Sequence, residues 1–320
     1  MTPTSSGGLR TGARPIHSRA GTTPIVCAID SRFVLPLCVL MESLARTNAH
    51  SLDKMRLILL YEDLAPDSVE RLRFHTARLD LHLELRRTDL VGRDLPVSSR
   101  ITKATYLRLQ IGDMFPDEQR VLYVDADMVI LTDIAPLLEL STGGYPLAAV
   151  PDPTGPQFRF REAAERWHKL GIPLEREYFN AGVILFDLAA CAETELFQRA
   201  DEFLVKYPEC AVHHDQDALN WAADGRWQRL DPRWNTFPMS TIAARPDYVH
   251  RSEHVLPLHS LHQSESRAAI LHFSGRHKPW QETCPDGPSL RLYRRYLQRV
   301  VAHESGASPP PFAEHPEGRS

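Results

Sequence analysis

Residues 121–131 read VLYVDADMVIL, in which two carboxylates, Asp125 and Asp127, interrupt an otherwise apolar run. Residues two apart in a strand project to the same side, so we expect both carboxylates on one side of an extended backbone. Ionised carboxylates are costly to bury without a partner. Their oxygens suit Mg²⁺ or Mn²⁺, which in turn suits a phosphate. The run predicts a buried strand ending at a cation site; the alternative is a turn that carries two aspartates and no ion.

Size and composition indicate an ordinary globular protein. The chain has 320 residues, 42% hydrophobic and 24% charged, and no apolar run approaches a membrane-spanning length. The formal net charge of −4 gives no reason to expect a nucleic acid partner. Five scattered cysteines without a CxxC pair favour free thiols in a reducing compartment, and we therefore expect a cytoplasmic location.

The two ends of the chain differ in composition from the middle. Residues 1–22 are rich in Ser, Thr, Gly and Pro and lack the apolar segment of a secretory signal, which predicts a disordered leader. Residues 304–320 are Pro-rich with few apolar side chains, which predicts a disordered tail. We expect one folded domain over residues 23–303.

Strand-like and helix-like segments alternate in the first part of this domain. Apolar runs predict buried strands at 24–29 and 55–61, alternation of apolar and polar residues predicts a half-exposed strand at 81–87, and helical spacing predicts helices at 33–46 and 66–79. This order indicates an α/β fold with a parallel sheet, whose ligands bind beyond the carboxyl ends of the strands. Asp30 follows the first strand, and Asp125 and Asp127 follow a later one. No GxGxxG or P-loop motif is present.

Further elements follow the same patterns. We predict helices at 103–113, 158–170, 193–207, 215–223 and 289–303, and strands at 147–150, 180–188 and 269–273. The closing helix is basic and amphipathic. A weak contact with an anionic membrane surface and a packed helix with a solvated Arg face are both compatible with that pattern.

The segment after the last strand supplies a third candidate ligand. His272 ends an apolar strand, and imidazole complements two carboxylates around Mn²⁺. Gly275 permits a ligand to approach the backbone closely, Lys278 can neutralise a phosphate, and Trp280 can line a pocket. His277 competes for any role given to His272.

Three other sites carry polar groups suited to a ligand. Asn180 offers both donor and acceptor, as recognition of sugar hydroxyls needs, although a turn at the start of a strand also favours Asn. Arg108 can pair with Asp125 or reach a diphosphate. Residues 213–217, HHDQD, suggest either a helix N-cap at Asp215 or a second metal site, but adjacent residues on a helix do not face one direction.

Taken together, these segments resemble the family 8 glycosyltransferases, retaining enzymes that include bacterial lipopolysaccharide galactosyl- and glucosyltransferases and glycogenin. The resemblance covers about residues 24–300. It rests on six segments in order: Ala28-Ile29-Asp30, KATYLRL, VLYVDADMVIL, YFNAGVILFDL, HHDQDALN and LHFSGRHKPW. It implies a single GT-A type domain with a mixed, mainly parallel sheet, a UDP-hexose donor (galactose or glucose) and a saccharide or glycolipid acceptor.

The resemblance also implies roles for individual residues. Asp125, Asp127 and His272 match the ligands of Mn²⁺, with Mg²⁺ as the alternative, and Lys278 matches a phosphate contact. The other matched donor-site positions are Ala28 and Asp30 at the uridine, Arg108, Asn180, Asp215 and Gln216 around the sugar, and Ala126, Ala181 and Gly275. One departure is the turn DSRF at 30–33, where the family often has Tyr or Asn; Phe33 can supply a stacking face.

A retaining outcome needs either a carboxylate nucleophile or same-face attack guided by the departing phosphate. Gln216 is a poor nucleophile, so we favour same-face transfer in which Gln216, Asp215 and Asn180 position the sugar. Asp217 is a less certain participant. One rival function is a haloacid-dehalogenase-like phosphatase, but its DxD normally follows the first strand, and Met128 is unusual after the second Asp. The other rival is an inactive UDP-sugar-binding protein.

Overall fold

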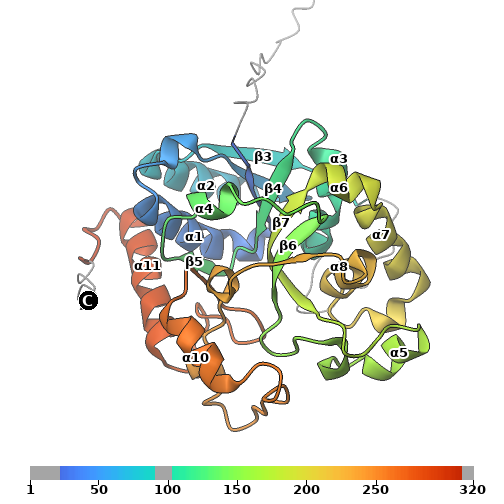
Figure 1. Cartoon of the computed structure of the whole chain (residues 1–320). Coiled ribbons are helices and arrows are strands. Elements are labelled where there is room, and N and C mark those ends of the chain that lie inside the picture. The colour runs from blue at the N-terminus through green and yellow to red at the C-terminus, as the bar shows by residue number, and fades with distance from the viewer. Residues whose placement is uncertain (1–21, 91–102, 312–320) are drawn as a thin grey trace, which may run out of the picture.

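A seven-stranded mixed sheet runs through the domain in the order β3-β2-β1-β4-β7-β6-β8 (Figure 1). The computed structural model describes residues 22–90 and 103–311, so nearly all of the predicted leader and residues 312–320 of the predicted tail lie outside it. Strands β1 to β4 are parallel, whereas β7 runs antiparallel to both β4 and β6. The strands are β1 (Ile25–Ala28), β2 (Leu57–Tyr61), β3 (Leu83–Arg87), β4 (Arg120–Val124), β6 (Leu147–Pro151), β7 (Phe179–Asp187) and β8 (Gln228–Arg229).

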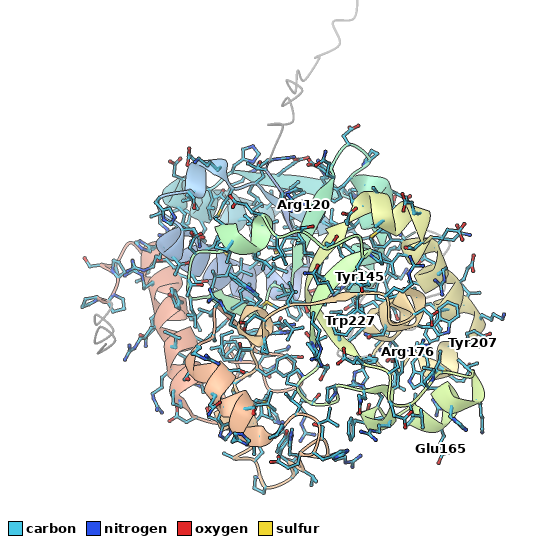
Figure 2. All side chains as sticks on the ribbon, in the orientation of Figure 1. Arg120, Tyr145, Glu165, Arg176, Tyr207 and Trp227 are labelled. Carbon is cyan, nitrogen blue, oxygen red and sulfur yellow. The ribbon has the colours of Figure 1, made fainter. Side chains whose placement is uncertain are left out.

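Helices cover both faces of the sheet, and side chains fill the space between the layers (Figure 2). In β1, Ile25 and Cys27 join the core under α1, α2 and α11, whereas Val26 joins the core under α7 and α8. Burial on both faces explains why β1 and β2 read as continuous apolar runs, whereas the half-exposed β3 does not. These helices are α1 (Val34–Thr47), α2 (Pro66–Leu79), α7 (Leu196–Lys206), α8 (Asp215–Ala223) and α11 (Pro288–Glu304).

The run 121–131 contains the predicted buried strand, which ends as β4 directly before Asp125, but the expectation that Asp125 and Asp127 lie on one extended backbone was wrong. It divides into β4 and a short strand β5 (Met128–Ile130), which belongs to a second sheet. There β5 pairs antiparallel with β9 (Ile270–His272), with Met128 opposite His272. Asp125 and Asp127 therefore lie in the bend between two sheets, and strand alternation does not determine which way they face.

Three predicted helices are broken. The segment 103–113 is a 3₁₀ helix followed by one α-helical turn. The segment 158–170 is interrupted at Arg161, which has extended backbone geometry, and 193–207 is interrupted at Glu195, with φ of 53°. The pieces are η3 (Lys103–Gln110), α3 (Ile111–Met114), η4 (Phe158–Phe160), α5 (Ala164–Lys169) and α6 (Leu188–Glu193).

Several short elements were not predicted. The longest is α10 (Leu258–Ser266), which packs beside α9 (Met239–Ile242) below the second sheet (Figure 1). The remaining elements are η1 (Ser31–Phe33), η2 (Leu52–Lys54), α4 (Ala135–Leu138), η5 (Pro208–Cys210) and η6 (Pro232–Asn235).

The apolar face of α11 is buried in the core through Tyr293, Tyr296 and Val300, while Arg294 and Arg295 are exposed. Any contact of this helix with a membrane would therefore rely on charge rather than on apolar side chains. Among the described residues, none of the helices combines the length and apolarity that crossing a membrane requires.

A buried carboxylate joins three helices on one face of the sheet. Glu42 of α1 is 1% exposed and accepts hydrogen bonds from Arg78 of α2 and Arg299 of α11. Burial alone would raise the pKa of Glu42, but the hydrogen bonds from Arg299 and Arg78 bring it below the ordinary value. The carboxylate is therefore ionised at neutral pH and paired with two guanidinium groups.

We expect Glu42→Gln to lower the free energy of unfolding at pH 7 by about 3 kcal/mol, because it leaves two partly buried guanidinium groups without their carboxylate. Because the folded pKa is depressed, the contribution of Glu42 exists above its unfolded pKa and is lost as pH falls. The difference between the two proteins should therefore shrink below about pH 4. Urea denaturation measures it, with the exposed Glu70→Gln as control. Equal stability of Glu42→Gln and the unaltered protein at pH 7 would contradict this.

Candidate functional site

Two carboxylates and an imidazole meet where the two sheets join. One ligand atom from each of Asp125, Asp127 and His272 lies within 4.8 Å of the others. His272 Nε2 is 3.8 Å from Asp125 Oδ2 and 3.5 Å from Asp127 Oδ1. The structure thus brings together the three residues that the sequence offered as metal ligands.

The imidazole fits into this site because residue 182 has no side chain. A Cβ atom on Gly182 would lie 2.4 Å from His272 Cε1 and 2.7 Å from His272 Nδ1. The carbonyl of Gly182 also accepts a hydrogen bond from the Asp125 N–H at 2.8 Å. Gly182 therefore fixes the approach of β7 to both Asp125 and His272.

A chain of amides determines which nitrogen of His272 faces the carboxylates. The backbone N–H of Gly182 donates to Asn180 Oδ1 at 3.0 Å, and Asn235 Nδ2 donates to the same oxygen at 2.8 Å. Asn235 Oδ1 is then left to accept from His272 Nδ1 at 2.8 Å. Since Nδ1 carries the hydrogen, Nε2 of the neutral ring presents its lone pair to Asp125 and Asp127.

Each carboxylate uses one oxygen for a protein cation and directs the other toward His272. Arg108 donates to Asp125 Oδ1 at 2.8 Å, and Tyr123 Oη donates to the same oxygen at 2.9 Å. Lys278 Nζ donates to Asp127 Oδ2. Burial would raise the pKa of Asp127, but the Lys278 ammonium and, when the ring is protonated, the His272 imidazole hold it far below its ordinary value. The three atoms that face one another, and that could bind a metal ion, are Asp125 Oδ2, Asp127 Oδ1 and His272 Nε2.

Asp215 at the start of α8 lies on the other side of Arg108. Its Oδ2 is 2.8 Å from Arg108 Nε, but that N–H donates to the Thr105 carbonyl, so Asp215 Oδ2 has an ionic contact but no hydrogen bond from the residues that the structure describes. Burial raises the pKa of Asp215 to about 7, which the Arg108 charge only partly opposes and the Asp125 charge reinforces. A buried acceptor without a donor can receive one from a ligand.

The side-chain amide of Gln216 is fixed in orientation by its neighbours. Its Oε1 accepts from Asn180 Nδ2 at 2.9 Å and from the Ala181 N–H at 3.0 Å. Its Nε2 donates to Asp152 Oδ2 at 3.2 Å and to Tyr178 Oη at 3.3 Å. Both ends of the amide are occupied, and its carbonyl oxygen is not available as a nucleophile.

Sequence reasoning missed Asp152 and Arg161, both of which are buried here. Asp152 lies 3.6 Å from the Arg161 guanidinium; burial would raise the pKa of this carboxyl, but Arg161 and hydrogen bonds from Thr154 hold it below its ordinary value. Asn235, which orients His272, was missed as well. The signal at Asp152 is only a Pro-Asp-Pro turn, and Asn235 lies in a 3₁₀ turn far from any motif.

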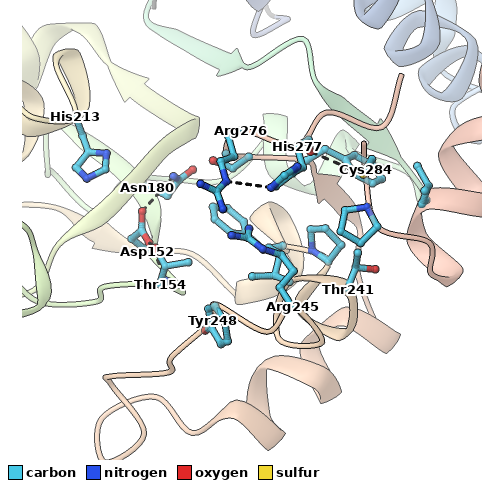
Figure 3. Close-up of a pocket in the computed structure, with 18 of the residues that line it drawn as sticks. Asp152, Thr154, Asn180, His213, Thr241, Arg245, Tyr248, Arg276, His277 and Cys284 are labelled. Carbon is cyan, nitrogen blue, oxygen red and sulfur yellow. Dashed lines mark hydrogen bonds between the residues drawn. The ribbon is translucent and has the colours of Figure 1, made fainter. Parts of the chain in front are cut away.

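A cavity of about 300 Å³ lies next to this network (Figure 3). Asp152 lines it from the turn that follows β6, Asn180 from β7 and Gln216 from α8, and Gly275 lines it with φ of +97°. In the segment that follows β6, the ring of Phe158 packs against the rings of Trp167 and Tyr178, with centroid distances of 5.1 and 5.2 Å. Those three rings belong to the core.

The remaining predicted donor positions lie at strand ends. Ala28 ends β1, and continuing the β1–β4 register brings it level with Asp125. Asp30 follows and pairs with Arg32 at 3.0 Å, while Ala126 is buried between the two carboxylates. Phe33, offered as a stacking face, packs against Trp280 in a T-shaped arrangement, with the ring centroids 5.7 Å apart.

Other candidates are engaged elsewhere. Asp217 accepts from Tyr178 Oη at 2.6 Å and from the His213 N–H. The His213 ring pairs with Glu162, and His214 bonds Tyr106, so the HHDQD segment forms no second metal cluster within the described residues. His277 accepts a hydrogen bond from Arg276 and does not replace His272. The N-cap reading of Asp215 is also wrong, because Asp215 lies inside α8 and His214 precedes it.

Known structures share this architecture. The galactosyltransferase LgtC, solved with donor and acceptor sugar analogs, aligns with a TM-score of 0.69 at 22% identity, covering 91% of this chain and 98% of its own. The bifunctional glycosyltransferase WbbM aligns with a TM-score of 0.71 at 21% identity, covering 91% and 52%. These likenesses confirm the predicted GT-A type fold.

Relatives by sequence agree. General stress protein A of Bacillus subtilis is 30% identical over 263 residues, which cover 80% of this chain and 86% of that protein. The lipopolysaccharide 1,2-glucosyltransferase of Escherichia coli is 29% identical over 208 residues, 64% of this chain and 56% of its own length. The lipopolysaccharide 1,3-galactosyltransferase of Salmonella typhimurium is 29% identical over 198 residues, which cover 59% of this chain and 52% of that protein. This chain thus spans about half of the last two proteins. The model of glycosyl transferase family 8 matches residues 24–284, and the chain belongs to that family.

Proposed function

We propose that this protein is a retaining hexosyltransferase that moves galactose or glucose from a UDP-sugar to a saccharide or glycolipid acceptor. Family membership supports sugar transfer, and the names of the glucosyl- and galactosyltransferase relatives support a hexose and a role in lipopolysaccharide synthesis. The observation that carries the proposal is the convergence of Asp125, Asp127 and His272 beside Arg108 and Lys278. We place the protein in the cytoplasm, with weak contact at the inner membrane face left to experiment, and expect no nucleic acid partner.

The donor set fits a divalent cation. Two carboxylate oxygens and one imidazole lone pair, oriented by Asn235, suit Mn²⁺, with Mg²⁺ as the alternative. A cation held by Asp125, Asp127 and His272 would neutralise charge on the donor diphosphate as it leaves. The residues around the site supply the rest of the chemistry.

Lys278 and Arg108 flank the two carboxylates and carry positive charge into a buried site. We assign Lys278 to the phosphates, where its charge stabilises the leaving group as the glycosidic C–O bond breaks. Ala28, Asp30, Ala126, Ala181 and Gly275 would contact the rest of the donor. The small size of the Ala and Gly residues among them allows a nucleotide to approach the backbone closely.

Asp215, Gln216 and Asn180 would hold the sugar. Among the described residues no group donates a hydrogen bond to Asp215 Oδ2, which can accept one from a sugar hydroxyl. When Asp215 is ionised, its charge also favours an oxocarbenium-like centre. The carbonyl oxygen of Gln216 is occupied by two donors, which supports same-face transfer over attack by Gln216. Trapping of a covalent glycosyl–Asp215 or glycosyl–Asp217 species would overturn this mechanism.

Two rival functions were weighed. Membership of a glycosyltransferase family removes the support for a haloacid-dehalogenase-like phosphatase. A catalytically inactive UDP-sugar-binding protein is the second candidate, and a panel of UDP-sugars separates it from an enzyme. An inactive protein would bind UDP with Mn²⁺ but would neither transfer nor hydrolyse any donor.

With Mn²⁺ present, we expect slow hydrolysis of UDP-galactose or UDP-glucose, measured as released UDP. Asp127→Ala and His272→Ala should each lower that rate by 100-fold or more, on the order of the loss of about 3 kcal/mol of electrostatic stabilisation. The exposed Asp117→Ala is the matched control and should keep the rate. Turnover that survives in both ligand variants would refute the metal assignment.

The amide chain predicts an effect without direct contact. Asn235→Ala should weaken Mn²⁺ binding by about 10- to 100-fold, because Nδ1 of His272 loses the acceptor that fixes its tautomer. Calorimetric Mn²⁺ titration measures the affinity, and the exposed Gln198→Ala serves as control. Unchanged affinity in a folded Asn235→Ala protein would show that the ring is oriented by other contacts.

The raised pKa of Asp215 predicts a pH dependence of stability in the metal-free protein. Folded Asp215 keeps its proton to about pH 7, whereas the unfolded chain loses it near pH 4, so the folded state binds more protons between these values. The free energy of unfolding should therefore fall with rising pH across this window more steeply than in Asp215→Asn. Thermal unfolding from pH 5 to 8 with a chelator tests it. Parallel curves for the two proteins would contradict the raised pKa.

A further inference from the structure

Two arginines at the cavity meet on a single carboxylate. Arg245 donates from Nε and one terminal nitrogen to Asp247 at 3.2 and 3.0 Å, and Arg276 donates to Asp247 Oδ2 at 2.7 Å. Both arginines line the cavity that also contains Asn180 and Gln216. Figure 3 shows their side chains converging in the middle of that pocket, from loops far apart in sequence.

The charges in this cluster do not cancel. Two guanidinium groups share one carboxylate, which leaves a net charge of about +1 at the cavity. His277 accepts a hydrogen bond from Arg276 and adds no negative charge. The one carboxylate among the lining residues, Asp152, lies beside its own cation, Arg161. Part of the charge of Arg245 and Arg276 is therefore available to a ligand.

These arginines are separate from the groups assigned to the donor diphosphate. Lys278 contacts Asp127 and Arg108 contacts Asp125, whereas Arg245 and Arg276 contact Asp247, outside that set. The side chain of Arg276 is 48% exposed and that of Arg245 is 23% exposed, so both can be reached by a molecule in the cavity. A guanidinium group pairs in bidentate fashion with phosphate and carboxylate.

We propose that the acceptor is an anionic saccharide, whose phosphate or carboxylate group is bound by Arg245 and Arg276 while its hydroxyl faces Gln216 and Asn180. This inference rests on the proposed function, since it assigns the acceptor side of the same cavity. Arg245 and Arg276 are specificity-determining residues, and Asp247 holds them in position and moderates their charge.

Calorimetry on the full chain with UDP and Mn²⁺, and again without them, tests the proposal. The probes are methyl glucoside, glucuronate, glucose 6-phosphate and inorganic phosphate. We expect at least one charged sugar to bind about 10-fold or more tightly than methyl glucoside. The two charged sugars distinguish carboxylate from phosphate, and inorganic phosphate shows whether the anion alone is sufficient. With UDP bound, the donor phosphate site is occupied and cannot account for the preference.

Variants separate recognition from a purely structural ion cluster. Arg276→Gln and Arg245→Gln should reduce the charged-to-neutral affinity ratio toward 1, whereas Asp247→Asn should increase it, because it removes the competing carboxylate. Arg295→Gln, an exposed arginine of α11, is the matched control and should leave the ratio unchanged. A structural cluster would instead lose melting temperature in all three cluster variants, with no opposite shifts in the ratio.

The outcomes also distinguish this inference from the proposed function. If UDP binds with Mn²⁺ but no charged sugar exceeds methyl glucoside, the acceptor proposal is wrong and the donor assignment stands. If UDP does not bind, the donor assignment fails, and the sugar titrations without nucleotide still decide whether Arg245 and Arg276 recognise an anion.

Discussion

The site depends on a backbone N–H, that of Gly182. Because this N–H needs an acceptor, the side-chain oxygen of Asn180 must face it. Asn235 must then direct its amide nitrogen to that oxygen and its own oxygen to His272. Flipping the side-chain amide of Asn180 or of Asn235 would place a buried hydrogen-bond donor against another donor. The peptide backbone of β7, rather than the carboxylates, therefore determines which nitrogen of His272 presents its lone pair to Asp125 and Asp127.

The same strand organises the sugar side. One residue earlier, the N–H of Ala181 donates to the side-chain oxygen of Gln216 and so fixes the orientation of that amide. The amide nitrogen of Gln216 therefore points to Asp152. Asn180 belongs to both networks, since its oxygen serves His272 through Asn235 and its nitrogen serves Gln216. The metal side and the sugar side are thus coupled through one amide, and a change at Asn180 would disturb both.

The sequence predicted the parts of the fold that follow from hydrophobic period: the parallel β-α-β order, α2 and α8. It also named Asp125, Asp127 and His272, which the structure brings together. It did not predict the division of 121–131, because apolar runs look alike whether they enter one sheet or two. It missed the break at Arg161 for a similar reason, since the helix gives way so that a buried guanidinium can reach Asp152. Asp152 and Asn235 have no local pattern; only the fold brings them to the site.

The bend at 125–127 has a mechanical consequence. The N–H of Asp125 is bonded to Gly182 in the large sheet, whereas the carbonyl of Asp127 accepts from the Phe273 N–H in the segment that follows β9. The backbone of Asp127 is therefore held in the second sheet and that of Asp125 in the large sheet. An ion held by all three ligands would cross-link the two sheets, in addition to the hydrogen bonds that join His272 through Asn235 to Asn180 of β7.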